Sequence, residues 1–138
     1  MSAPHVNLTW KDDFEFSASR GQFVTAIDGN ERAGPSPVSM LIESVAACAA
    51  IDVVHVLRKG RQELEGLQIS VWSDRVESSP RRLTGLRFEF RVAGPVAEKK
   101  ARRAIDLSFE KLCSVYHSLR PDIDLSWDLV MQTGGQAT

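Results

Sequence analysis

The chain has 138 residues, 43% hydrophobic and 25% charged, which is enough for one domain with a real hydrophobic core. The 17 basic residues are balanced by 18 acidic residues, and the net charge of -1 excludes a basic surface for nucleic acid or an anionic membrane. We expect a single domain over residues 1–131 and a disordered tail over residues 132–138.

The N-terminal segment predicts a cytoplasmic protein. Residues 1–10 lack the basic stretch and apolar run of a secretory signal. The longest apolar stretch, residues 45–57, is interrupted by Asp52 and His55 and is shorter than the roughly 20 residues of a membrane-spanning helix. We therefore expect no membrane association.

The first 28 residues alternate between apolar and polar side chains, as at Val6, Leu8 and Trp10. A period of two predicts strands, here an N-terminal β-meander. Residues 30–37 then concentrate glycine, proline and serine, which predicts a loop that ends at a helix start. Ser36 is the expected N-cap and Pro37 the first helical residue.

A long helix is predicted from Pro37 to Lys59, because no residue between them breaks it. Residues 44–54 are apolar or small on every side, so we expect protein to cover this helix all round. Its small-residue run, residues 46–50, allows another helix or a second subunit to approach closely.

Two further alternating stretches, residues 67–74 and 86–92, predict an antiparallel pair of strands. Residues 97–119 carry apolar side chains at helical spacing and predict an amphipathic helix that Pro121 ends. Residues 123–131 alternate again as a last strand. The fold class is therefore α+β, in the order βββ-α-ββ-α-β, with a long central helix wrapped by antiparallel strands.

Cys48 and Cys113 lie 65 positions apart and are the only cysteines. In a reducing compartment such a pair is not expected to be a structural disulfide, so the thiols are either inert core residues or redox-active. No nucleotide-binding, zincin or C-x-x-C motif occurs. A zinc site from this pair with His55 and His117 lacks the short ligand spacings of zinc modules, and we predict neither metal nor cofactor.

Electrostatics rank the two thiols. Cys48 lies in mid-helix, where the N-terminal dipole has faded, so its activation would need a cation. Arg20, Arg58 or an arginine of a second subunit are candidates. Cys113 is expected near the negative end of the second helix beside Glu110, which makes Cys48 the better attacking thiol unless a protonated His117 reverses the order.

Two segments resemble the OsmC/Ohr family. Residues 34–54, GPSPVSMLIESVAACAAIDVV, resemble the segment around its first cysteine, and residues 109–115, FEKLCSV, the segment around its second. The order of elements also matches, so the resemblance covers nearly the whole chain. It implies an intertwined homodimer with the long helices at its centre and an active site built from both subunits.

The resemblance also implies a chemistry, cysteine-based peroxidase activity in the oxidative stress response. Cys48 matches the peroxidatic cysteine, which forms a sulfenic acid with a small peroxide, and Cys113 the resolving cysteine, which closes a disulfide that a dithiol reductant opens. Peroxidase members commonly place a glutamate after the proline, where this chain has Val38. Either Glu43 or Asp52 takes that role, or the site binds a small apolar ligand in a redox-sensitive way.

Overall fold

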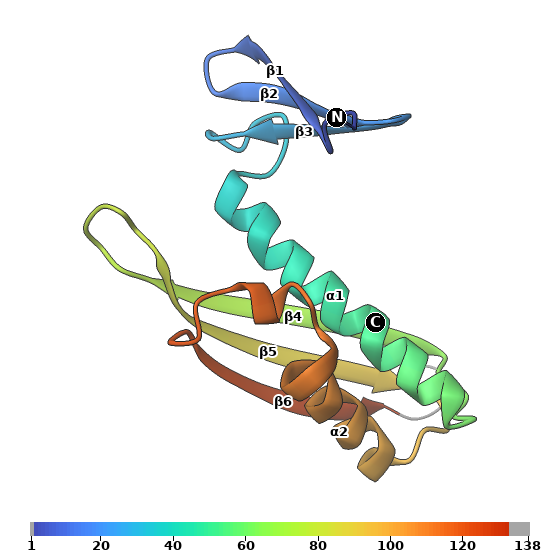
Figure 1. Ribbon diagram of the computed structural model, residues 1–138. Coiled ribbons are helices and arrows are strands. Elements are labelled where there is room, and N and C mark those ends of the chain that lie inside the picture. Colours follow the sequence, from blue (N-terminus) through green and yellow to red (C-terminus); the bar gives the residue numbers. More distant parts are fainter. Residues whose placement is uncertain (1, 133–138) are drawn as a thin grey trace. The chain divides into compact units, whose positions relative to one another are not determined.

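The computed structural model describes residues 2–132 as two compact units, each described by itself below. The division falls between Glu43 and Ser44, inside the long helix, and the two parts are called the N-terminal and C-terminal units. Three strands, a helix, two strands, a helix and a final strand follow one another (Figure 1), which confirms the predicted α+β order.

The N-terminal unit is a meander of β1 (Asn7–Asp12), β2 (Glu15–Arg20) and β3 (Phe23–Asp28). Each strand pairs antiparallel with the next. The first turn places Asp13 at φ 49°, and the second places Gly21 at φ 58°, a left-handed conformation that glycine adopts without steric cost. The predicted β-meander is therefore confirmed.

One face of this sheet is apolar and exposed. The register aligns Trp10 with Phe16 and Phe16 with Ile27, so these side chains share a face. Trp10 is 64% exposed and Phe23, also on this face, is 69% exposed. The N-terminal unit therefore builds a hydrophobic face without burying it.

The loop after β3 is organised by two carboxylates. Asp28 is buried and accepts hydrogen bonds from the backbone N–H groups of Asn30 (2.8 Å), Ala33 (3.1 Å) and Arg32 (3.3 Å). These bonds, that of Asn30 first, hold the pKa of the Asp28 carboxyl below its usual range. The carboxylate of Glu31 accepts from the Ser39 hydroxyl at 2.9 Å and so ties the loop to the start of the helix.

Helix α1 (Pro37–Lys59) begins where the sequence predicts. The Ser36 hydroxyl accepts from the Ser39 backbone N–H at 3.3 Å, as expected of an N-cap. The buried side chains of α1 are Val45, Ala49, Val53 and Leu57, which form a single stripe with a spacing of four residues.

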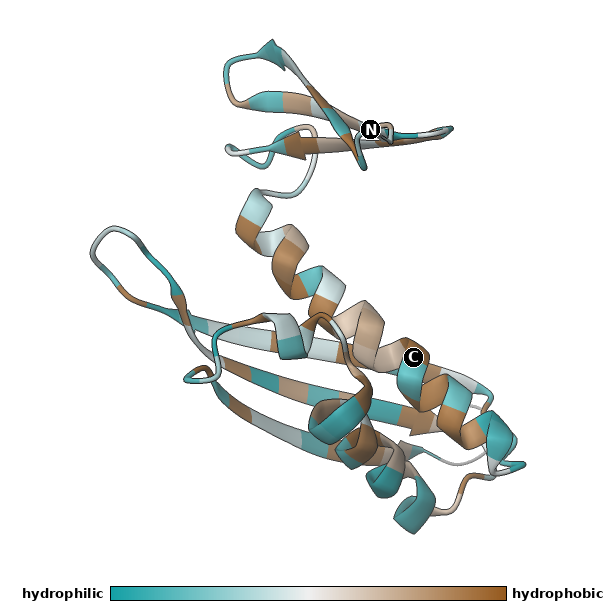
Figure 2. Ribbon diagram, in the orientation of Figure 1, coloured by the Kyte–Doolittle hydropathy of each residue, from teal (hydrophilic) through white to brown (hydrophobic). Residues whose placement is uncertain are grey.

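The single chain does not cover this helix on every side, so the predicted cover would come in part from a second subunit and stays a prediction. Ile51 is 68% exposed, and apolar residues recur along much of the helix outside its buried stripe (Figure 2). With 23 residues, α1 is longer than the apolar stretch of residues 45–57 that the sequence analysis compared with a membrane span. By length and composition this helix could cross a membrane. Core helices of soluble proteins meet the same criterion, so this property does not assign a location.

The C-terminal unit contains a second sheet, in the order β4 (Gly66–Arg75), β5 (Leu83–Ala93) and β6 (Asp124–Gln132). Strands β4 and β5 are antiparallel, as predicted, whereas β6 runs parallel to β5 because helix α2 (Glu98–Leu107) makes the crossover between them. Gln132, predicted to begin the tail, is the last residue of β6, and residues 133–138 lie outside the described part of the chain.

The core lies between this sheet and the helices on one of its faces (Figure 1). On the central strand β5, the alternating side chains Leu86, Phe88, Phe90 and Val92 are at most 2% exposed. On the opposite face Glu89 and Arg91 are half-buried and Arg87 is exposed. The guanidinium of Arg87 lies 4.0 Å from the centre of the Trp72 ring. This face of the sheet, which also carries Trp72 with an exposure of 46%, is called its wet face.

The second helix is shorter than predicted. It ends at Leu107 and continues as a π-helical turn, Ser108–Leu112, before the chain becomes extended at Cys113 and forms a short 3-10 turn, Tyr116–Ser118. The ring of Phe109 lies 5.0 Å from that of Phe88 and 5.6 Å from that of Tyr116. This aromatic chain anchors the irregular segment to the sheet.

Candidate functional site

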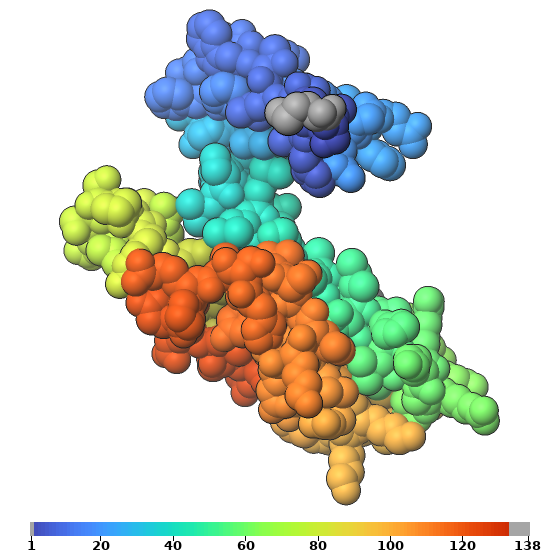
Figure 3. Space-filling view, in the orientation of Figure 1, coloured from blue at the N-terminus to red at the C-terminus, as the bar shows by residue number. Residues whose placement is uncertain are grey.

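Two cysteines from distant parts of the sequence meet in the C-terminal unit. Cys48 lies on α1 and is partly exposed, and Cys113 follows the π-helical turn and is fully buried. Figure 3 shows the segment around residues 108–118 against the side of α1. The Cys113 thiol lies 4.0 Å from the Val45 carbonyl oxygen, one helical turn before Cys48.

The two sulfurs and a carboxylate oxygen of Asp52 all lie within 4.8 Å of one another. The structure contains both cysteines as free thiols. Ser114 contributes a hydroxyl 3.8 Å from the Cys48 sulfur, and the Tyr116 backbone N–H donates to the Cys113 sulfur at 3.4 Å. We call Cys48, Asp52 and Cys113 the thiol–carboxylate cluster.

The surroundings of the two thiols move their pKa values in opposite directions. The backbone N–H of Val115 lowers the pKa of Cys48, and the Cys113 thiol and Ser114 act in the same direction against the effect of burial. Burial, together with the smaller effects of the nearby Cys48 sulfur and the Asp52 charge, raises the pKa of Cys113 to about 11. At neutral pH the thiolate therefore forms more readily at Cys48.

This ranking agrees with the sequence prediction but has a different cause. Cys113 is not at the end of an α-helix, so the helix dipole does not suppress its ionisation; burial does. The groups that favour the Cys48 thiolate are hydrogen-bond donors of residues 113–115, whereas the sequence predicted a cation in this role. No sequence signal marked Ser114 or the backbone of Val115 for this function.

Asp52 lies one helical turn after Cys48, on the same face of α1. Its carboxylate accepts a hydrogen bond from the Ser108 hydroxyl at 2.9 Å. Ser108 is fully buried, and its carbonyl oxygen accepts from the Cys113 backbone N–H at 2.8 Å. Ser108 therefore links the carboxylate to the backbone of the buried cysteine.

The sequence offered two arginines of this chain as activators of Cys48, namely Arg20 and Arg58. Arg20 belongs to the N-terminal unit, where its guanidinium lies 2.6 Å from the His5 ring nitrogen Nδ1. Arg58 is ten residues beyond Cys48 on α1, about 15 Å along the helix axis. Neither of them is among the groups that move the pKa of Cys48.

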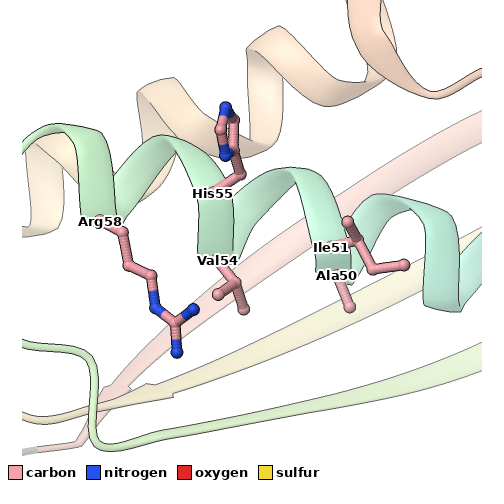
Figure 4. A pocket seen from close by; sticks show the side chains of 5 residues that line it. All are labelled: Ala50, Ile51, Val54, His55 and Arg58. Carbon is pink, nitrogen blue, oxygen red and sulfur yellow. The ribbon is translucent and has the colours of Figure 1, made fainter.

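The two helical histidines are not part of the cluster either. His55 is exposed and, with Ala50, Ile51, Val54 and Arg58, lines a groove of about 370 Å³ on α1. Its ring points away from the side on which Val54 and Arg58 project (Figure 4). His117 is exposed, with its ring 5.3 Å from that of Tyr116. The zinc site considered from the sequence, which used both histidines, is therefore not assembled.

The α+β fold and the two neighbouring thiols place this chain among small proteins with a pair of cysteines in one site. Comparisons with known proteins lead to a family with this fold. The family model of OsmC-like proteins matches residues 28–128. The protein YhfA of Escherichia coli K12 is 36% identical over 126 residues, which cover 88% of this chain and 92% of YhfA.

Solved structures share the fold. A hypothetical protein from Aquifex aeolicus has a TM-score of 0.84 at 28% identity, covering 96% of this chain and 99% of that one. The organic hydroperoxide resistance protein OhrB of Bacillus subtilis has a TM-score of 0.65 at 15% identity, covering 91% and 97% respectively. The chain belongs to the OsmC family.

Proposed function

We propose that this protein reduces peroxides through its two cysteines, with Cys48 as the attacking and Cys113 as the resolving residue. The observation that carries the proposal is the meeting of two sulfurs, 65 positions apart in sequence, within 4.8 Å in one compact unit. Their unequal exposure and opposite pKa shifts support the assignment of roles.

The reaction proceeds in three steps. The Cys48 thiolate attacks the terminal peroxide oxygen, the O–O bond breaks, and Cys48 becomes a sulfenic acid while the leaving alkoxide takes a proton from solvent and departs as an alcohol. The Cys113 sulfur then attacks the Cys48 sulfur, an S–S bond forms, and the hydroxyl leaves as water with the thiol proton. A dithiol donor reduces the disulfide by two exchange steps and is itself oxidised.

Burial of Cys113 has a place in this sequence. A fully buried thiol with a raised pKa is a poor nucleophile toward peroxide in solution, so it stays reduced until Cys48 is oxidised. Its S–H group meanwhile favours the Cys48 thiolate by hydrogen bonding. A small organic hydroperoxide is the proposed substrate, because the helix that carries Cys48 exposes apolar side chains such as Ile51.

We also propose that the working form is a homodimer in the cytoplasm. The exposed apolar face of β1–β3 and the uncovered side of α1 are surfaces that a second copy would bury. In such an assembly the partner's side chains reach the neighbourhood of Cys48, and an arginine that activates the thiol can come from there.

The test is peroxide consumption by the wild type and by Cys48→Ser and Cys113→Ser proteins with dithiothreitol as reductant. Cys48→Ser should abolish consumption, and Cys113→Ser should react once and accumulate a sulfenic acid that a trapping reagent labels at Cys48. Cumene hydroperoxide should react faster than hydrogen peroxide. A sulfenic acid at Cys113 in the Cys48→Ser protein, formed at the wild-type rate, would reverse the roles.

A second function is favoured by the groove on α1. Its lining is apolar apart from His55 and Arg58, and Val38 stands where peroxidase members of the family commonly carry glutamate. A redox-sensitive protein that binds a small apolar ligand would use these features without rapid turnover. If wild-type Cys48 reacts no faster than free cysteine, this function replaces peroxide reduction.

A further inference from the structure

We propose that the thiol–carboxylate cluster of Cys48, Asp52 and Cys113 binds a thiophilic divalent cation of the zinc type. The cluster supplies three donor atoms, two sulfurs and one carboxylate oxygen, that converge within 4.8 Å. Zinc bonds of about 2.3 Å to sulfur and about 2.0–2.2 Å to oxygen place tetrahedral ligands roughly 3.5–3.8 Å apart. A contraction of about 1.3 Å or less therefore brings the three donors to bonding distance.

The donor types select the cation. Two thiolates favour soft or borderline ions such as Zn²⁺, whereas Mg²⁺ and Ca²⁺ require a shell of oxygen ligands that a single carboxylate does not provide. Three protein ligands leave the fourth tetrahedral position to water. Cys48 and Asp52 are both partly exposed, so a cation can enter from their side and reach the buried Cys113.

The helix backbone and the groups that hydrogen-bond to the three ligands favour such a site. Cys48 and Asp52 are one helical turn apart, the spacing by which a rigid helix presents two ligands to one ion. The buried Ser108 hydroxyl donates to Oδ2 of Asp52 at 2.9 Å, which orients the carboxylate and leaves its other oxygen for the metal. The Tyr116 backbone N–H, 3.4 Å from the Cys113 sulfur, stabilises a bound thiolate.

Metal binding changes the number of protons and the charge at this site. Binding of one divalent cation replaces the two thiol protons, which pass to solvent, and the site with its carboxylate carries a net charge of about -1. No electrons are exchanged. Because the same sulfurs would form the proposed disulfide, metal binding and oxidation exclude each other, and a bound cation protects both thiols from peroxide.

Co²⁺ titration of the reduced full-length protein is the test. A tetrahedral Co²⁺ site with two thiolates shows visible bands and a near-ultraviolet sulfur-to-cobalt charge-transfer band, which Zn²⁺ should abolish by displacement. We expect saturation at one equivalent. The Cys48→Ser and Cys113→Ser proteins should retain about half of the charge-transfer intensity per bound ion.

Asp52→Asn and the matched control Glu110→Gln separate this site from adventitious binding by two thiols. Each variant removes one carboxylate, but Glu110 is exposed and not part of the cluster. Asp52→Asn should weaken Co²⁺ binding by about tenfold or more, Ser108→Ala by about tenfold, and Glu110→Gln not at all. Circular dichroism of the Asp52→Asn protein checks that it folds.

Two results would overturn the inference: no charge-transfer band in the reduced wild type, or equal Co²⁺ affinity of the Asp52→Asn and Glu110→Gln proteins. The titration uses no peroxide, so its result is independent of the proposed enzymatic function. Protein with both thiols alkylated serves as the blank and should show no band.

Discussion

The two three-stranded sheets of this chain differ in what covers them. In the C-terminal unit, β5 carries Phe88 and Phe90, both fully buried under the helices. In the N-terminal unit, Trp10 and Phe23 lie on one face and remain 64% and 69% exposed. One sheet of the chain thus has its own core, whereas the apolar face of the other sheet is exposed.

This difference separates two sources of stability. The cysteines lie in the unit that has a core, where packing around Phe109 holds the segment that carries Cys113. The N-terminal sheet depends on hydrogen bonds, on the carboxylate of Asp28 and, as proposed, on a second copy of the chain. The predictions below test this division, from the largest expected effect to the smallest.

Truncation of a buried side chain in the C-terminal sheet should have the largest effect on the free energy of unfolding. Phe88→Ala removes a fully buried ring that contacts Phe90 and Phe109, and it should lower the free energy of unfolding by about 3–5 kcal/mol. Urea denaturation followed by circular dichroism measures this. A loss below about 1 kcal/mol would show that the C-terminal core is not the main source of stability.

Truncation of an exposed aromatic side chain in the N-terminal sheet should weaken the association of two chains. Trp10→Ala should weaken the proposed dimer by about 2–4 kcal/mol, because a large exposed aromatic side chain is a typical interface hot spot. Trp72→Ala, on the wet face of the other sheet, is the matched control and should leave the mass unchanged. Light scattering over a dilution series measures both, and a wild type that is monomeric at micromolar concentration contradicts the prediction.

Loss of the Asp28 charge should loosen the loop after β3. Asp28→Asn weakens three backbone hydrogen bonds, so the amides of Asn30, Arg32 and Ala33 should exchange with solvent about tenfold faster. Asp12→Asn, at an exposed position, should not change them. Hydrogen exchange monitored by nuclear magnetic resonance provides the measurement.

The same carboxylate sets a pH dependence. Because the folded pKa of Asp28 lies below its unfolded value of about 3.9, its contribution is complete above that pH and is lost as the pH falls through the folded pKa. Loop protection in the wild type should therefore fall in acid, and the Asp28→Asn protein should lack this transition. Identical acid profiles for the two proteins would assign the transition to another carboxyl group.

The smallest effect is expected on the wet face of the C-terminal sheet. Arg87→Ala removes a guanidinium stacked 4.0 Å from the Trp72 ring and should cost about 0.5–1 kcal/mol of unfolding free energy. Urea denaturation measures the difference, and the fluorescence of Trp72 should report the lost contact. A cost above about 2 kcal/mol would mean that this face is covered in the working protein.

Much of the fold follows from patterns in the sequence. Alternation in β5 predicts which of its side chains are buried, and Ser36 with Pro37 marks the start of α1. The exposure of Ile51 was not predicted, because an apolar helix reads the same whether its own chain or a second copy covers it. The end of α2 at Leu107 was also missed, since Ser108 and Leu112 keep a helical spacing through the π-helical turn.

The candidate site was predictable only in part. Cys48 and Cys113 stood out by residue type and by resemblance, and the structure brings them together. The group with the largest effect on Cys48 is the backbone N–H of Val115, and because all residues except proline carry such a group, no side-chain pattern could reveal it. The bond from Ser108 to Asp52 depends on the π-helical turn, which the sequence did not predict.

The separation of the two cysteines has a consequence for the unfolded chain. A bond between them would close a ring with 65 positions between its ends, enclosing β4, β5 and α2. Loop-closure entropy for a ring of this size corresponds to about 4 kcal/mol, comparable to the loss expected from removing Phe88. Oxidised protein should therefore resist heat and proteolysis better than reduced protein, so that exposure to oxidant also lengthens the lifetime of the chain.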